Sequence, residues 1–325
     1  MAAGRAASTA ARLVQLVERD ATMFHAPDGV AYVRLQHAER FEVHPVRSGQ
    51  FRAWLAKAFF DKTRGRRAPS SQTLQDALGV LEARALHDGE EHPVSVRLAE
   101  SAGRLYVDLC DLERHVVEVS PDGWRVLDDP PVRFVRRRGM RALPYPARGG
   151  SINALRQFVN VRSEDDFRLL VGWLLQAARP RGPYAVLALV GGQGSAKSTT
   201  ARVLRALLDP NEAPLRAAPR EERDLAISAA NAWAVCFDNV SRLPDWMSDA
   251  ICRLATGGGF ATRELYSDRE ETILNVQRPV LLNGIEEFVA RGDLLDRTML
   301  VYTPAIPDGA RRSERTFWQE FEREA

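Results

Sequence analysis

The chain has 325 residues, 45% of them hydrophobic, so it is long enough to form two domains with buried cores. Its 45 Lys and Arg residues almost balance its 43 Asp and Glu residues, which excludes a globally basic nucleic-acid-binding protein and leaves only local patches. Scattered cysteines, and histidines without metal-ligand spacing, argue against a zinc site and fit a reducing cytoplasm. No apolar run is long enough for a membrane span, so we expect a cytoplasmic protein without a membrane partner.

The first half of the chain predicts a small α+β domain. Apolar spacing predicts helices over about 51–60 and 70–81, and a change to period two predicts a β meander over about 94–126. The segment between the two helices is basic, with Lys62, Arg64, Arg66 and Arg67. Two helices followed by hairpins are typical of a winged-helix module that contacts DNA. A small α+β domain with solvated basic loops explains the pattern equally well.

A basic cluster and a linker end this first half. The cluster has no acidic residue in its sequence and contains Arg133, Arg136, Arg137, Arg138 and Arg141. Such a cluster suits contacts to nucleic-acid phosphates, although clusters also arise by chance in an arginine-rich chain. The following stretch 144–150 is rich in proline and glycine. We place the boundary there, between an N-terminal α+β domain (1–150) and a second domain (151–325).

The segment 184–208 combines three elements of a phosphate-binding site. Residues 185–190 form an uninterrupted apolar run, typical of a strand buried on both faces in a parallel sheet. A glycine-containing loop follows, and then apolar residues at helical spacing. This order predicts the P-loop of an ATP-binding protein, in which backbone amides and the helix dipole bind phosphates. The residues expected to contact ATP are Gly191, Gly192, Gln193, Gly194, Ser195, Ala196, Lys197, Ser198 and Thr199.

Two of these residues carry specific roles. Lys197 is expected to bind the β- and γ-phosphate oxygens, and Ser198 is expected to bind Mg²⁺. The motif GxxxxGK[ST] is met with one departure, because Ala196 stands where the last glycine belongs. The only other lysines are Lys57 and Lys62, so a lysine at this position is not expected by chance. A plain strand-to-helix turn in an α/β domain is the alternative.

Two later strands offer candidates for the rest of the nucleotide site. The apolar strand 233–237 leads into Asp238, which we expect on the strand beside the P-loop strand, where it would hold Mg²⁺ together with Ser198. A core strand that happens to end in Asp is the alternative. A third apolar strand, 280–282, leads into Asn283, whose amide can orient the attacking water.

The last part of the chain adds a hairpin and two arginines. A glycine run introduces two short strands over about 261–276, with an expected turn at Ser267-Asp268-Arg269-Glu270. Arg297 or Arg291 is expected to reach the γ-phosphate held by a neighbouring subunit, where a cation stabilises the charge that develops in phosphoryl transfer. A surface arginine beside Asp296 is an equally good interpretation.

The order of these features resembles the compact AAA+ core of superfamily 3 helicases. P-loop, strand ending in Asp238, inserted hairpin, strand ending in Asn283 and late arginine follow one another over residues 151–305. The arrangement is most similar to the ATPase domains joined to primases in phages, plasmids and integrative elements. The resemblance implies a parallel sheet and a homo-oligomeric ring, such as a hexamer, with ATP and Mg²⁺ between subunits and single-stranded DNA in the central channel.

The family pattern also assigns roles to residues, and the sequence departs from it at Ala196, at Asn239 and in the acidic hairpin turn. It gives phosphate and Mg²⁺ binding to Lys197 and Ser198, the Walker B carboxylate to Asp238, sensor 1 to Asn283 and the arginine finger to Arg297. Asn239 follows the Walker B position, where many relatives carry a second acid, and an amide cannot accept a proton from water. Hydrolysis is therefore expected to be slow or to need another carboxylate. The hairpin turn is acidic, which argues against DNA contact there, and the short tail leaves little room for a lid beyond one helix, 314–324.

Three functions follow from this sequence. The first is a DNA-dependent ATPase that serves as a replicative or mobile-element helicase motor on single-stranded DNA, with a separate primase as a candidate partner. The second is an ATP-switched initiator or loader that binds DNA or a partner without processive unwinding. The third is a small-molecule kinase, which is disfavoured because Asn283 and the late arginines would then have no role. DNA-stimulated ATP turnover distinguishes the three.

Overall fold

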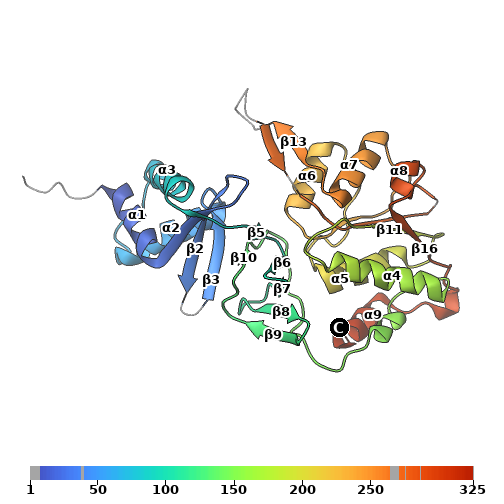
Figure 1. The fold of residues 1–325 in the computed structure, drawn as a ribbon. Coiled ribbons are helices and arrows are strands. Elements are labelled where there is room, and N and C mark those ends of the chain that lie inside the picture. Colours follow the sequence, from blue (N-terminus) through green and yellow to red (C-terminus); the bar gives the residue numbers. More distant parts are fainter. Residues whose placement is uncertain (1–7, 38–39, 264–270, 275, 286, 325) are drawn as a thin grey trace, which may run out of the picture. The chain divides into compact units, whose positions relative to one another are not determined.

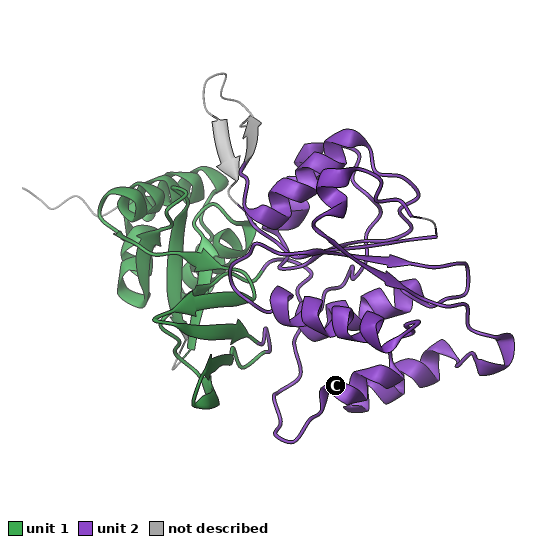
Figure 2. Cartoon of the chain, turned by 45° about the vertical axis from the view of Figure 1, so that its right-hand side comes forward, with its two compact units in different colours: residues 1–108, 112–136 green, residues 109–111, 137–325 purple. Residues whose placement is uncertain are grey.

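The computed structural model describes residues 8–37, 40–263, 271–274, 276–285 and 287–324 (Figure 1). Two compact units divide the chain (Figure 2). Unit 1 comprises Met1–Asp108 and Leu112–Arg136, and unit 2 comprises Leu109–Asp111 and Arg137–Ala325. The proline- and glycine-rich stretch 144–150 lies within unit 2. No helix in the described part of the chain is both long enough and apolar enough to cross a membrane.

The first part of unit 1 packs three helices on a four-stranded sheet. The helices are α1 (Thr9–Asp20), α2 (Gly49–Lys62) and α3 (Ser71–His87). The sheet has the order β3–β2–β1–β4, from β1 (Ala21–His25), β2 (Ala31–His37), β3 (Arg40–Pro45) and β4 (Glu90–Glu91). The two predicted helices are confirmed as α2 and α3. Serine side chains cap both, since Ser48 Oγ accepts from Phe51 N (3.2 Å) and Ser70 Oγ accepts from Thr73 N (3.2 Å).

The predicted meander is confirmed in the second part of unit 1. Its antiparallel strands are β6 (Leu98–Ser101), β7 (Arg104–Asp108), β8 (Val116–Ser120) and β9 (Gly123–Leu127), paired in that order. A short parallel pair, β5 (Val94–Ser95) and β10 (Arg133–Phe134), accompanies them. The meander forms a sheet of its own, separate from the sheet on which α1, α2 and α3 pack. The winged-helix interpretation stays a prediction.

Unit 2 is built around a parallel sheet, which confirms the predicted α/β class with a parallel sheet. Its strand order is β12–β15–β11–β16, from β11 (Val186–Val190), β12 (Val235–Phe237), β15 (Val280–Gly284) and β16 (Thr298–Tyr302). The α-helices of this unit are α4 (Glu164–Ala177), α5 (Lys197–Leu208), α6 (Glu222–Ala230), α7 (Asp245–Thr256), α8 (Gly292–Leu295) and α9 (Glu314–Glu324). Two 3₁₀ helices, η1 (Ile152–Gln157) and η2 (Asp308–Ala310), complete it.

Helices cover both faces of this sheet, which explains why its strands are apolar throughout (Figures 1 and 2). Along β11, Val186, Ala188 and Val190 share a buried cluster with α6 and α7. Helices α4 and α5 cover the opposite face. The cap predicted for α4 is present, since Ser163 Oγ accepts from Asp166 N (3.1 Å). Helix α9 packs on Phe158 through the rings of Phe317 and Phe321.

The position of β12 corrects one expectation. Asp238 was expected on the strand next to the P-loop strand, but β15 lies between β12 and β11. In the register, Leu189 of β11 pairs with Asn283 of β15, and Leu282 of β15 pairs with Phe237 of β12. The expectation fails because strand order in a parallel sheet depends on where each crossover returns, and residue spacing along the chain does not encode that.

The inserted hairpin is confirmed in its strands. Strands β13 (Phe260–Arg263) and β14 (Glu271–Leu274) form an antiparallel pair in which Arg263 lies opposite Glu271. The expected turn, Ser267-Asp268-Arg269-Glu270, lies outside the described residues.

Candidate functional site

The loop 191–196 between β11 and α5 has the backbone that its glycines allow. Gly194 lies at φ +75°, in the left-handed region that glycine enters without penalty. A Cβ on Gly191 would lie 2.3 Å from the carbonyl oxygen of Thr303, so only glycine permits that approach. Ala196, the departure from the motif, is also left-handed at φ 58°, which costs about 1 kcal/mol for a residue with a side chain. The backbone therefore keeps the glycine-like turn without the glycine.

Lys197 is directed back over this loop. Its Nζ donates to the carbonyl oxygens of Gly191 (2.7 Å) and Gly192 (2.8 Å) and to Ser195 Oγ (3.3 Å). Burial lowers the pKa of the Lys197 ammonium, and the nearby Asp238 carboxylate opposes that shift. A partly buried ammonium whose hydrogen bonds all go to neutral oxygens is a favourable place for an added anion.

Ser198 and Asp238 meet at the carboxyl end of the sheet, although one strand separates the elements that carry them. Ser198 Oγ donates to Asp238 Oδ1 at 2.8 Å. In the part of the chain that the structure describes, no group of three or more His, Cys, Asp or Glu residues is placed to hold a metal. One hydroxyl and one carboxylate suit Mg²⁺, which usually keeps most of its water ligands and binds substrate phosphates.

Asn283 lies near the end of β15, the strand between β11 and β12. Its Oδ1 accepts from the backbone N–H of Asn239 (3.0 Å), which fixes the direction of the amide. Its Nδ2 is buried and has no hydrogen-bond partner among the described residues. Since buried donors are almost always paired, this one is available for a ligand oxygen. The structure thus brings Lys197, Ser198, Asp238 and Asn283 to one edge of the sheet.

Arg297 is not brought to this edge, and Arg291 is held beside α7. The Arg297 carbonyl accepts from Val186 N (2.9 Å) at the start of β11, whereas the glycine loop follows its end. The length of β11 separates the Arg297 carbonyl from the glycine loop by about 17 Å. The Arg297 side chain donates to the Asp293 carbonyl, and Arg291 pairs with Asp249 at 3.0 Å. The Arg297 side chain therefore cannot reach the glycine loop of its own chain.

Three residues that line the loop escaped the sequence reasoning. The amide of Asn160 donates to the carbonyls of Ser195 (2.9 Å) and Pro304 (2.6 Å). Thr303 Oγ1 lies 3.0 Å from Ser195 Oγ, and Arg311 lies against Gly194. The sequence did contain one signal for Thr303. This residue directly follows β16, and because β16 is parallel to β11, its carboxyl end lies at the same edge of the sheet as the glycine loop. Nothing in the local sequence singles out Asn160 or Arg311.

A cavity of about 830 Å³ adjoins the loop. Its walls come from the segment before α4, from the loop and α5, and from the chain after β16. The lining includes Val159, Asn160, Gly194, Ala196, Thr199, Pro304, Ile306 and Arg311. This volume lies within the range of small-molecule and cofactor sites.

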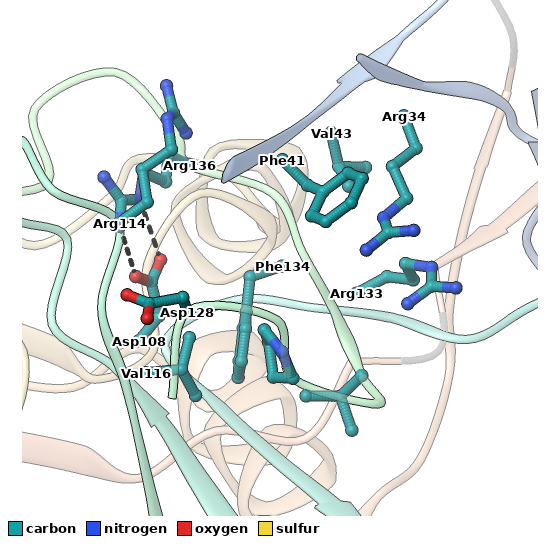
Figure 3. A pocket seen from close by; sticks show the side chains of 12 residues that line it. Arg34, Phe41, Val43, Asp108, Arg114, Val116, Asp128, Arg133, Phe134 and Arg136 are labelled. Atoms are coloured by element: carbon teal, nitrogen blue, oxygen red, sulfur yellow. Dashed lines mark hydrogen bonds and ion pairs between the residues drawn. The ribbon is translucent and has the colours of Figure 1, made fainter. Parts of the chain in front are cut away.

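At least one arginine of the predicted cluster is engaged in contacts within the protein. Arg136 makes two hydrogen bonds to Asp108, at 2.6 and 3.1 Å, inside unit 1 (Figure 3). The pocket around this pair measures about 40 Å³, which holds no more than a water or two. On its other side Arg34 stacks over Phe41. Arg138 and Arg141 are exposed. Because Arg136 is bound to Asp108, the cluster offers one cation fewer to phosphates than its sequence suggests.

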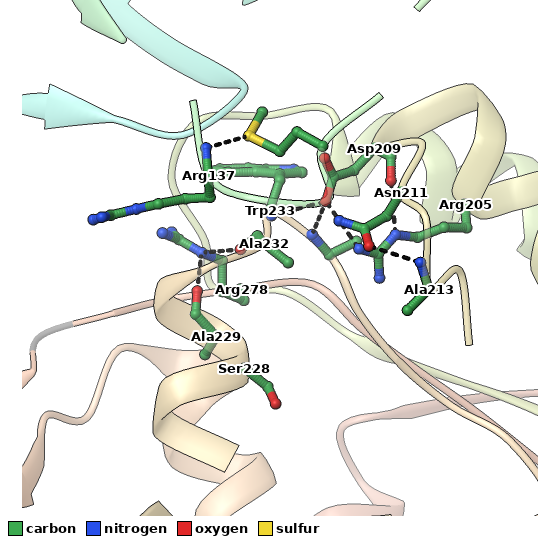
Figure 4. A network of polar contacts seen from close by, with 12 residues as sticks. Arg137, Arg205, Asp209, Asn211, Ala213, Ser228, Ala229, Ala232, Trp233 and Arg278 are labelled. Carbon is green, nitrogen blue, oxygen red and sulfur yellow. Dashed lines mark hydrogen bonds and ion pairs between the residues drawn. The ribbon is translucent and has the colours of Figure 1, made fainter. Parts of the chain in front are cut away.

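A buried polar network ties α5 to the start of β12 (Figure 4). Asp209, at the end of α5, accepts from the backbone N–H groups of Trp233 (2.9 Å) and Ala234 (3.3 Å) and pairs with Arg205 (3.2 Å). Nearby, Arg278 donates to the carbonyls of Ala229 (3.0 Å) and Ala232 (2.9 Å), and its burial lowers its pKa to about 10. The network holds together the two elements that present Ser198 and Asp238.

These observations define an α/β protein whose parallel sheet gathers a lysine, a serine, an aspartate and an asparagine at its carboxyl edge. The family model for the actinomycete integrative conjugative element replication protein matches residues 152–325. The chain therefore belongs to this family of replication proteins. No curated protein gives a significant match.

Solved structures of the NrS-1 C-terminal region are similar to this chain. The "A form apo structure" of that region has a TM-score of 0.50 at 10% identity and covers 96% of this chain and 66% of that one. An apo structure of residues 305–718 has a TM-score of 0.49 at 10% identity and covers 98% and 68%. This chain spans about two thirds of that region. At such low identity the likeness concerns the fold alone.

Proposed function

We propose that unit 2 is a P-loop ATPase of the superfamily 3 helicase type and that the chain is a replication motor acting on single-stranded DNA. The observation that carries this proposal is the 2.8 Å contact between Ser198 and Asp238, at the head of a helix that follows a glycine loop. Residues 40 positions apart in sequence meet where a Mg²⁺-bound triphosphate would need them. Membership in a family of mobile-element replication proteins supports the DNA-directed part.

The residues at the carboxyl edge of the sheet are suited to the separate tasks of a phosphoryl-transfer site. The amides of the glycine loop and the α5 dipole would hold phosphate oxygens, and Lys197 would exchange its carbonyl contacts for the β- and γ-phosphates. Mg²⁺, bound through Ser198 and Asp238, would neutralise the developing charge. The free Nδ2 of Asn283 can orient the attacking water or the γ-phosphate.

Arg297 fits a role in a neighbouring subunit. It lies at the edge of the sheet opposite the glycine loop, so an arginine finger at this position must act on the nucleotide of another chain. A ring of identical subunits supplies that geometry, because each heterologous interface repeats until the ring closes. The homo-oligomeric ring, with single-stranded DNA in its channel, is part of the proposal.

Rates of ATP hydrolysis with and without single-stranded DNA test the motor function. We expect turnover in the presence of Mg²⁺ that rises several-fold on addition of single-stranded DNA and disappears with EDTA. Transfer of the γ-phosphate to a small acceptor, with no effect of DNA, would instead support a kinase. Absence of any nucleotide binding would refute the proposal as a whole.

Mixing two inactive variants tests the role of Arg297. Lys197→Ala subunits keep the finger and Arg297→Ala subunits keep the loop, so mixed assemblies regain complete sites at some interfaces. We expect each variant alone to hydrolyse ATP at least a hundredfold more slowly than the wild type, and the mixture to recover at least a tenth of wild-type turnover. No recovery across mixing ratios, in assemblies shown to exchange subunits, would contradict action between subunits.

An ATP-switched initiator or loader is a second candidate, favoured by Asn239. This residue follows Asp238 at a left-handed φ of 54° and is exposed, but its amide cannot act as a general base. Tight ATP binding with negligible turnover, even with DNA, would support this candidate over the motor.

A further inference from the structure

The chain after β16 lies along the glycine loop. We call residues 303–312 the C-terminal strap. It is fixed to the loop at two points: Thr303 N donates to the Val190 carbonyl (2.8 Å), and Ile306 N donates to the Gly194 carbonyl (3.2 Å). The strap and the loop therefore hold a defined position relative to each other, and a group on the strap can belong to the nucleotide site.

Arg311 brings a guanidinium to this position. Its Nη2 would lie 2.6 Å from a Cβ built on Gly194, so it lies directly against the loop backbone. Its other contacts are weak: Nε donates to the Ile306 carbonyl at 3.3 Å, and Nη1 pairs with Asp308 at 3.0 Å, where both side chains are more than half exposed. Exposed ion pairs of this kind contribute little, so they hold Arg311 in place without satisfying it fully.

The cavity shows which part of a nucleotide would pass Arg311. If the loop and the N-terminus of α5 bind the phosphates, the nucleoside of the same nucleotide must extend away from the loop on one side of it. On the side of Thr199 and Ala196 the 830 Å³ cavity is open to receive it, and Arg311, Pro304 and Ile306 line that same cavity. Arg311 thus borders both the loop, where the phosphates are expected, and the cavity, where the nucleoside is expected.

We propose that Arg311 is a nucleotide-binding residue of its own chain and contacts the β-phosphate held by the glycine loop. This inference rests on the proposed ATPase function and deepens it. It differs from the role of Arg297, because Arg311 acts within one subunit. A planar guanidinium is well suited to phosphate oxygens, which it can bind through two N–H groups at once.

Nucleotide affinities of four proteins test the proposal: the wild type, Arg311→Ala, Arg311→Lys and Arg315→Ala. Arg315 is an exposed arginine on the first turn of α9 and serves as the matched control for loss of one positive charge. Isothermal titration calorimetry with ATP and ADP, and competition with AMP, give the dissociation constants.

We expect Arg311→Ala to weaken ATP and ADP binding about tenfold or more, Arg311→Lys to weaken it less, and Arg315→Ala to leave it unchanged. AMP has no β-phosphate, so its affinity is expected to change less than threefold. Equal losses for AMP and ATP would show that Arg311 only supports the strap, which would overturn the proposal. Wild-type affinity in Arg311→Ala would also overturn it, while the ATPase proposal would stand. Failure of the wild type to bind any nucleotide would instead refute the ATPase proposal.

Discussion

Lys197→Ala is expected to weaken ATP binding at least a hundredfold without unfolding the protein. The ammonium now donates to two loop carbonyls, at 2.7 and 2.8 Å, and would bind two phosphate groups in the complex. Each hydrogen bond between a cation and an anion contributes about 1.5–3 kcal/mol, and two of them amount to a hundredfold or more. Because burial already lowers the pKa of Lys197, removing its charge should not destabilise the free protein.

Thermal unfolding with and without ATP separates binding from folding in this variant. The wild type should gain about 2.7 kcal/mol of stability at an ATP concentration a hundred times the dissociation constant, and Lys197→Ala should gain almost none at the same concentration. Lys62→Ala, which removes an exposed lysine at the end of α2, is the control and should behave like the wild type. An unchanged ATP-induced shift in Lys197→Ala would remove the phosphate-binding role of the loop.

Asp209→Ala is expected to destabilise unit 2 by about 3–5 kcal/mol, the usual cost of leaving a buried charge without its partner. The side chains of Asp209 and Arg205 are 0% and 3% exposed. The substitution removes the carboxylate that pairs with the Arg205 guanidinium, and it leaves the backbone N–H groups of Trp233 and Ala234 without their acceptor. Chemical denaturation followed by tryptophan fluorescence measures the loss, since Trp233 lies beside the network.

The double variant Arg205→Met, Asp209→Ala provides the internal check. Removing both charges relieves the stranded cation, so the double variant should be more stable than Asp209→Ala alone, although the two N–H groups stay unpaired. Asp165→Ala removes a carboxylate that is 85% exposed and should change stability by less than about 0.5 kcal/mol. A loss below about 1 kcal/mol in Asp209→Ala would contradict the importance assigned to this network.

The strands of unit 2 could be predicted from the sequence, but their order in the sheet could not. The apolar runs around Val186, Val235 and Val280 identify strands because burial on both faces leaves no polar alternation. That β15 inserts between β11 and β12 depends on long-range packing of α7 and the crossover, which local pattern does not record. The contact between Ser198 and Asp238 nevertheless agrees with prediction, because both lie at the carboxyl edge shared by all parallel strands.

Other parts of the site were beyond sequence reasoning for a different reason. Asn160 and Arg311 belong to irregular segments, and only their side chains contact Ser195, Pro304 and Gly194, so no periodicity marks them. The prediction of phosphate contacts by Arg136 lost support because its partner, Asp108, lies far away in sequence and close in space. Spacing reports local structure well, while ion pairing between distant segments appears only in three dimensions.

Hydrogen–deuterium exchange with and without Mg²⁺ and ATP tests the binding of a triphosphate at the glycine loop most directly, because it reports the location of the ligand. We predict slower exchange in peptides that cover 191–199, with a weaker effect over 303–312, and no change in either segment when EDTA replaces Mg²⁺. Protection confined to other segments, with the amides of 191–199 exchanging at their free rate under saturating ATP, would contradict the account.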